Sequence, residues 1–310
     1  MDFVVSLTAG SFSFGSEGSM SADWVKPTSF DGRFYPDSPR TLEKMIVDFE
    51  KEIEESPPIF SGRVVGVVSP HAGYVFSGST AARAYHAAQD PHVETIILIG
   101  LCHRVHMKGV SVLEAAACET PLGPIEYDQE FQTLLSDRLP RSSFQKKAHL
   151  EEHSIETQLP FIKRYFPAAR IVEILTQEDQ APVPQTLGMA VAETAEALQR
   201  RILIVASTDL SHYPPRDIAE QIDPESLKWI GSLNPEQAER EIRKIESRGE
   251  PGVHCAVCSK AAVLAGMTAA QHLGAVQGIQ LGYTNSGHSP YGENDRVVGY
   301  GAVAWVKNGN

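Results

Sequence analysis

The stretch RVVGVVSPHAGY, residues 63–74, predicts the kind of fold that this chain adopts. Its uninterrupted apolar run is typical of a parallel strand that is buried on both faces. A proline, a histidine and a glycine follow at once, and the exit from such a strand is where ligands bind in an open α/β sheet. We therefore predict a buried strand that delivers His71 to a crevice at the carboxyl edge of a sheet.

Two further apolar runs, at 95–100 and 201–205, end in the same way. The first is followed by His103, and the second by Asp209 and His212. Because the carboxyl ends of parallel strands meet at one edge of a sheet, we expect these side chains to share one crevice with the first histidine. Two imidazoles with a carboxylate or a thiolate are ligands for a transition metal, so the sequence indicates a metal site.

The rest of the chain alternates between helix and strand patterns. Apolar residues recur at helical spacing, and a further buried strand is expected at 170–175. The predicted helices cover about 38–54, 81–88, 130–139, 154–166, 184–200, 235–247 and 253–273. Alternation in the tail predicts two antiparallel strands, near 279–283 and 297–306. This order favours an α/β fold with a mostly parallel sheet, helices on both faces and antiparallel strands at the C-terminal end.

Composition limits the domain organisation and the function classes. The chain has 310 residues, 42% of them apolar, and a net charge of −12, which argues against a nucleic-acid partner because such a partner requires a basic face. No stretch approaches the roughly 18 apolar residues of a membrane span. Residues 1–24 are rich in Gly and Ser and are expected to be a disordered leader or tag, followed by one domain over 25–308. Four cysteines and the lack of a signal peptide predict a cytoplasmic protein.

Several candidate residues also have ordinary structural explanations. Asp209 is suited to cap a helix. Cys255 and Cys258 form a Cys-x-x-Cys motif, but a zinc knuckle needs a second pair, so two buried helical cysteines are an equally simple interpretation. In the segment EHSIE, His153 and Glu156 would share one face of a helix, while its other polar residues fit a helix cap as well.

Taken together, these motifs resemble the Memo family, the protein B component of the AmmeMemoRadiSam set. The resemblance extends over residues 25–306 and rests on five short segments in the family's order. They are GRFYP at 32–36, SPHAGY at 69–74, GLCH at 100–103, EHSIE at 152–156 and STDLSH at 207–212.

The Memo family is similar in fold to the class III extradiol dioxygenases of the LigB type, whose non-haem iron is held by two histidines and a glutamate. The resemblance therefore implies a metal site of His71, His103 and Cys255, with Asp209 nearby and His212 at the position of an acid/base histidine. The chain departs from the family pattern by having Cys-Ala-Val at 255–257 in place of Cys-Gly-Arg. A thiolate softens the site and favours copper(I) or zinc over a metal that prefers oxygen ligands. Together with the iron of the related dioxygenases, the resemblance implies iron(II) or copper as the cofactor, with zinc as the alternative.

Three function classes remain open. The leading one is a metal-dependent redox enzyme of unknown substrate, related to the dioxygenases, in which His212 moves protons with the help of Asp209. The first alternative is a non-catalytic module that binds a metal or a peptide. The second is a hydrolase in which Asp209 or Glu156 activates water. We expect a small molecule or a peptide as the partner, no nucleic acid and no membrane; a homodimer is compatible with the chain, although no interface signature is present.

Overall fold

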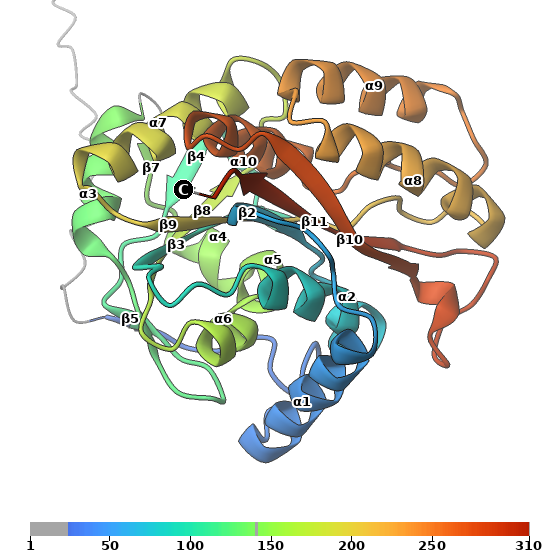
Figure 1. Ribbon diagram of the computed structural model, residues 1–310, viewed down its shortest axis with the longest axis horizontal. Helices are drawn as coiled ribbons and strands as arrows, with labels where there is room; N and C mark the ends of the chain where they lie inside the picture. Colours follow the sequence, from blue (N-terminus) through green and yellow to red (C-terminus); the bar gives the residue numbers. More distant parts are fainter. Residues whose placement is uncertain (1–23, 140–141, 310) are drawn as a thin grey trace, which may run out of the picture.

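A computed structural model describes residues 24–139 and 142–309 and has one eight-stranded sheet at its centre, with helices on both faces (Figure 1). The predicted leader at 1–24 lies outside the described residues, apart from Trp24. Among the described residues, no helix is long and apolar enough to cross a membrane.

The strand order of the large sheet is β10–β11–β2–β9–β3–β8–β4–β7. Its strands are β2 (Arg63–Ser69), β3 (Thr95–Leu101), β4 (Val110–Val112), β7 (Ser142–Ser143), β8 (Arg170–Thr176), β9 (Ile202–Ser207), β10 (Gln277–Asn285) and β11 (Gly299–Lys307). The four central strands β2, β9, β3 and β8 are parallel, and β10 and β11 form an antiparallel pair beside β2. The predicted α/β class is confirmed. A small sheet of β1 (Val25–Lys26), β5 (Ala117–Cys118) and β6 (Ile125–Glu126) lies apart from it.

The two helical layers divide the core into two apolar clusters. One face carries α1 (Pro39–Glu55), α2 (Tyr74–Ala87), α4 (Lys146–Leu150), α5 (His153–Glu156) and α6 (Leu159–Tyr165). The other carries α3 (Gln129–Arg138), α7 (Val183–Ala197), α8 (Arg216–Gly231), α9 (Pro235–Ser247) and α10 (Lys260–His272) (Figure 1). Along β3, Ile96 and Leu98 pack into the first cluster, whereas Ile97 and Ile99 pack into the second. This alternation explains why the central strands are apolar throughout.

Two predicted helices on the first face differ from the structure. Helix α2 begins at Tyr74 and not at 81, because the carbonyl of Gly73 accepts the backbone N–H of Phe76 and of Ser77. The predicted helix 154–166 is two helices, α5 and α6, which are interrupted before Pro160. Proline has no N–H to donate to the preceding turn, so it is tolerated at the start of α6 but ends the continuity with α5.

The other face also departs from the prediction. Helix α8 is not predicted at all, and it contains Pro224 at an interior position, which obscures the helical pattern. The predicted helix 253–273 begins only at Lys260, so Cys255 and Cys258 lie in the loop that precedes α10 and not within a helix. The remaining predicted helices and strands agree with the structure to within a few residues at their ends.

Helix α8 contributes one buried carboxyl group that makes the stability of this fold depend on pH. Asp223 accepts hydrogen bonds from the backbone N–H of Ser211 at 3.0 Å and from the hydroxyl of Tyr283 at 2.9 Å. Burial raises the pKa of Asp223 from 3.8 to about 6. The folded protein therefore retains this proton up to a higher pH than the unfolded chain does. Between the pKa of the unfolded chain and that of the folded protein, a rise in pH lowers the free energy of unfolding.

We expect the contribution of Asp223 to lower the free energy of unfolding by about 2–3 kcal/mol as the pH rises from about 4 to 6. In an Asp223→Asn variant this decrease is absent, so urea unfolding at several pH values gives a flatter profile. The matched control is Asp217→Asn, an exposed position on the same helix that should keep the wild-type profile. Equal slopes for both variants between pH 4 and 6 would contradict the prediction.

Candidate metal centre

Three of the predicted site residues occupy equivalent places at neighbouring strand ends. His71, His103 and Asp209 each come two residues after the end of their strand, β2, β3 and β9 respectively. Because β9 pairs with both β2 and β3, the three side chains emerge side by side. The rings of His71 and His103 are 5.2 Å apart between centroids, and Nε2 of His71 is 3.8 Å from Oδ2 of Asp209.

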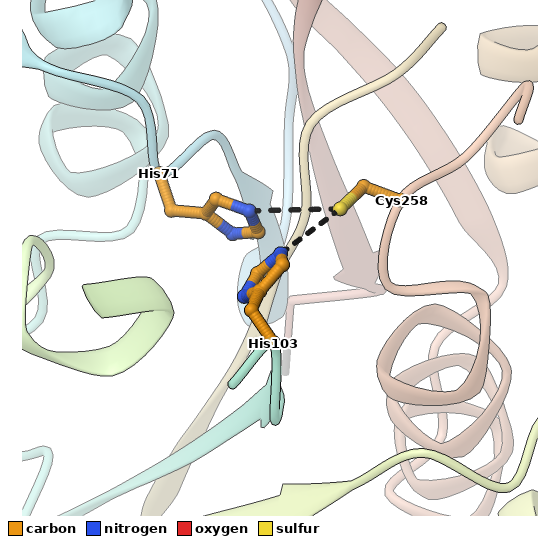
Figure 2. Close-up of side chains that lie close together, drawn as sticks. All are labelled: His71, His103 and Cys258. Atoms are coloured by element: carbon orange, nitrogen blue, oxygen red, sulfur yellow. Dashed lines mark hydrogen bonds between the residues drawn. The ribbon is translucent and has the colours of Figure 1, made fainter. Parts of the chain in front are cut away.

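The thiol beside the two imidazoles is that of Cys258 (Figure 2). Its Sγ lies 3.3 Å from Nε2 of His103 and 3.9 Å from Nε2 of His71. Figure 2 shows both rings directed toward the sulfur, from the loops after β2 and β3, while the cysteine comes from the segment before α10. One ligand atom from each residue lies within 4.8 Å of the others, which is compact enough to hold one metal ion.

Cys255, which the family resemblance places at the metal, is not part of this group. The loop before α10 forms backbone hydrogen bonds with the loop after β9: the N–H of His254 donates to the carbonyl of His212 at 3.0 Å, and that of Cys258 to the carbonyl of Asp209 at 3.0 Å. The N–H of Ser259 donates to Oγ1 of Thr208 at 2.8 Å. This pairing fixes Cys258 next to Asp209, whereas Cys255 lies beside His212, whose backbone N–H donates to the carbonyl of Cys255 at 3.1 Å. The structure therefore places the second cysteine of the Cys-x-x-Cys motif, and not the first, beside the two imidazoles.

The hydrogen bonds of His71 determine which ring nitrogen is free. Ser207 donates its single hydroxyl hydrogen to the carbonyl of Ser154, at 2.6 Å. Nδ1 of His71 lies 3.0 Å from the same hydroxyl oxygen, so Nδ1 must be the donor in that contact. Nε2 of His71 then carries a lone pair, and this is the nitrogen that faces Cys258.

His103 is held in the same tautomer by a carboxylate. Nδ1 of His103 donates to Oε1 of Glu152 at 2.8 Å, and its backbone N–H donates to Oε2 at 2.6 Å. Burial alone would raise the pKa of Glu152, but its hydrogen bond and electrostatic interaction with His103 outweigh burial and lower that pKa to about 2. Glu152 is therefore an ionised acceptor, and Nε2 of His103 is left free to bind a cation. Metal-binding histidines in proteins have this pattern, with the outer N–H given to a carboxylate or another acceptor.

The three side chains of the cluster differ in their exposure to solvent. His71 is buried, Cys258 is half-buried, and the side chain of His103 is 23% exposed. Burial lowers the pKa of His71 well below its usual range and raises the pKa of the Cys258 thiol. Both groups are thus neutral in the free protein, and a bound cation would supply the charge that stabilises a thiolate.

Two more histidines border the cluster. The ring of His153 is 4.6 Å from that of His103 and 5.4 Å from that of His71, and burial lowers the pKa of His153 to about 3. The EHSIE motif singled out this histidine, but the resemblance did not include it among the ligands. Burial also lowers the pKa of His212, and its Nε2 is buried without a hydrogen-bond partner among the described residues. Asp209, whose pKa is raised by burial, accepts the backbone N–H of His71 at 2.8 Å.

Glu156 organises a wall beside the histidines and is not free to act at the metal. Its carboxylate accepts the backbone N–H of Ser29 and of Phe30 at 3.0 and 2.7 Å, and the hydroxyl of Tyr35 at 2.8 Å. These bonds hold the 29–35 loop so that Phe34 packs against His153, with ring centroids 4.7 Å apart. The wall therefore limits the space in which a molecule can approach the cluster from this side.

Comparison with known proteins identifies relatives along nearly the whole chain. The family described as Memo-like protein matches residues 26–304. A MEMO1 family protein of Methanopyrus kandleri is 34% identical over 281 residues, which cover 88% of this chain and 96% of that protein. A MEMO1 family protein of Ignicoccus hospitalis is 33% identical over 290 residues, covering 90% and 98%. One of Nitrosopumilus maritimus is 31% identical over 278 residues, covering 89% and 97%.

Proposed function

This chain belongs to the Memo family, and on that premise we propose that it binds one transition-metal ion through His71, His103 and Cys258. The observation that carries the proposal is the orientation of the two imidazoles. Each gives its Nδ1–H to an acceptor of the protein and turns its free Nε2 toward the same thiol. This arrangement directs two nitrogen lone pairs at one sulfur atom. It suits a metal site, and histidines with a purely structural role do not require it.

Iron(II) or copper is the metal that we propose, with zinc as the alternative. Two imidazoles and one thiolate form a donor set of intermediate to soft character, which suits copper(I), iron and zinc better than magnesium or calcium. Such a metal supplies Lewis-acid and redox chemistry to a substrate at the exposed side of the site.

The reaction that we propose is a metal-dependent oxidation, related to that of the extradiol dioxygenases, on an unknown small molecule. The residues that would move protons are His212 and His153, whose neutral forms are favoured by burial. The ring of His153 contacts those of His71 and His103, and His212 interacts electrostatically with His103 and Asp209. Asp209 holds the loop that carries His71 and faces the same space. Asp209 is therefore a positioning group, and its buried carboxyl, whose pKa is raised by burial, interacts electrostatically with His212.

The two alternative functions differ in what they require of the same site. A hydrolase needs a carboxylate that is free to activate water, and Glu156 is fully engaged by the 29–35 loop, which leaves only Asp209 for that role. A metal carrier or peptide-binding module needs the cluster but not the two bordering histidines. The redox enzyme should consume oxygen as it turns over substrate, and the hydrolase should turn over substrate without consuming oxygen. The metal carrier or binding module should exchange its metal and show no turnover.

The test of the metal site uses the residue that orients His103. We expect the protein, purified anaerobically without chelators, to bind one equivalent of iron(II), copper(I) or zinc, and Glu152→Gln to weaken that binding by about 10–100-fold. The reason is that an amide accepts the His103 N–H less strongly than the carboxylate does. The adjacent exposed Glu151→Gln is the matched control and should bind as the wild type. Folded wild-type protein that binds none of the three metals would overturn the proposal.

For the setting of this chemistry we propose the cytoplasm, where thiols stay reduced. The four cysteines, Cys102, Cys118, Cys255 and Cys258, all carry free thiols in the structure. We propose a small molecule or a peptide as the partner and, because the chain carries a net charge of −12, neither nucleic acid nor an anionic membrane surface.

A further inference from the structure

A cavity of about 820 Å³ opens at the amino ends of β2 and β9, at the opposite edge of the sheet from the metal centre. Four basic side chains line it, those of Arg63, Arg200, Arg201 and Lys307, against a single carboxylate, that of Asp90. In a chain whose net charge is −12, such a concentration of positive charge in one hollow requires an explanation. It also lies away from every residue that the metal site uses.

The four basic residues are not equally neutralised. Arg200 contacts Glu130 at 2.8 Å and Glu94 at 3.5 Å, and Nε of Arg201 is 3.1 Å from Oδ2 of Asp90. Arg63 and Lys307, in contrast, have no carboxylate oxygen within 4.0 Å of their side-chain nitrogens in the part of the chain that the structure describes. Neither of these two positive charges therefore has a close ion pair among the described residues, although Asp90 interacts with Arg63 at longer range.

The strand register brings these two charges together. Lys307 of β11 lies directly opposite Arg63 of β2 in the antiparallel pair. Like charges in directly opposite positions destabilise a sheet. Arg201, directly before β9, joins them. Burial lowers the pKa of Lys307, and the positive charges of Arg63 and Arg201 lower it further. The fold thus maintains a cluster of three cations that repel one another.

Neutralisation of helix ends does not account for the cluster. Helices α2, α7 and α10 end beside the cavity, and basic side chains often bind the free carbonyls of helix C-termini. Neither Arg63 nor Lys307 donates a side-chain hydrogen bond to any such carbonyl among residues 24–139 and 142–309. Their donors are instead available to a molecule in the cavity.

We propose that this cavity binds a small organic molecule that bears a phosphate group, with the phosphate between Arg63, Arg201 and Lys307. A phosphate ester carries close to two negative charges at neutral pH, which matches a cluster with two unpaired cations. Arginine forks suit phosphate oxygens, and two of the three cations are arginines. Part of the cavity wall is apolar and consists of Val64, Val65, Ile202 and Leu273. The volume of the cavity is within the usual range for organic ligands. Both features indicate a ligand that is larger than an inorganic ion.

The test measures binding of phosphorylated and unphosphorylated probes by calorimetry at constant ionic strength. The probes are adenosine 5′-monophosphate and ribose 5-phosphate, each against its unphosphorylated parent, adenosine or ribose. We expect saturable binding of at least one phosphorylated probe, and a loss of at least about 10-fold in Arg63→Gln/Lys307→Gln. Lys44→Gln/Lys228→Gln removes the same charge from two exposed positions and should bind as the wild type.

A second measurement separates a binding role from a structural one. If the cations serve a ligand, their removal relieves repulsion, so the unliganded Arg63→Gln/Lys307→Gln variant should melt no lower than the wild type. A markedly lower melting temperature would show that the cluster stabilises the fold itself and would overturn the proposal. So would the absence of saturable binding by both phosphorylated probes, or equal affinities in the two double variants. None of these results depends on the presence of a metal.

Discussion

Replacement of Cys258 by alanine is expected to abolish stoichiometric metal binding, whereas the same replacement of Cys255 is expected to leave it intact. The Sγ of Cys258 is the atom that faces Nε2 of both His71 and His103, at 3.9 and 3.3 Å. Loss of a ligand from a group of three should cost more than the roughly 10–100-fold that follows from loss of a supporting hydrogen bond. Elemental analysis and competition with a chelator of known affinity measure the effect.

The two cysteines are matched controls for each other. They lie in one loop, three residues apart, both are partly exposed, and burial raises the pKa of both thiols. A His71→Ala/His103→Ala variant provides the reference for a destroyed site. If Cys255→Ala loses the metal and Cys258→Ala keeps it, the first cysteine is the ligand, as the family resemblance implied, and the proposal for Cys258 is overturned.

The sequence was sufficient to predict the parallel core and the strand ends that bear the site. Strands buried on both faces have a continuous apolar sequence, and tertiary context rarely overrides this pattern. A residue two places after such a strand lies at the carboxyl edge of the sheet. For this reason His71, His103 and Asp209 could be expected in one crevice. The sequence also indicated the histidine and the two glutamates of EHSIE, although not their roles.

Which of the two cysteines lies beside the two imidazoles could not be predicted in this way. Cys255 and Cys258 fit the same motif, and the choice between them depends on backbone hydrogen bonds to a loop almost 50 residues earlier in the chain. The helix pattern assigned to 253–273 concealed that pairing, since it treated the loop as part of α10. The cavity at the opposite edge of the sheet could not be predicted from the sequence for a similar reason. Arg63 and Lys307 lie together only because of the register between β2 and β11.

Replacement of Lys26 by methionine is expected to destabilise the protein by about 3–5 kcal/mol. Lys26 and Glu173 form a buried ion pair, with Nζ 2.7 and 3.0 Å from the two carboxylate oxygens and exposures of 1% and 0%. The same carboxylate accepts hydrogen bonds from Tyr127 and His149, both at 2.8 Å. Burial alone would raise the pKa of Glu173, but Lys26 and His149 outweigh it and lower that pKa to about 2, so Lys26→Met leaves a buried negative charge without its cation.

A double-mutant cycle with Glu173→Gln tests this explanation by urea unfolding. Glutamine keeps one acceptor for the neighbouring donors but carries no charge, so the Lys26→Met/Glu173→Gln variant should recover much of the stability that Lys26→Met loses. The exposed Lys44→Met, which removes a surface ion pair with Asp48, should change the free energy of unfolding by less than about 1 kcal/mol. A loss below about 1 kcal/mol for Lys26→Met, or no recovery in the double variant, would contradict the prediction.

The same substitution separates the stability of the fold from the integrity of the metal centre. Lys26 belongs to β1, and the chain leads from there into the 29–35 loop that Glu156 holds against His153. The three proposed ligands, in contrast, are fixed by β2, β3 and the loop before α10, none of which contacts Lys26 through a hydrogen bond. Lys26→Met should therefore melt at a lower temperature and still bind its metal with wild-type stoichiometry when folded. Loss of metal in the folded variant would mean that the small sheet, through the 29–35 loop, takes part in forming the site.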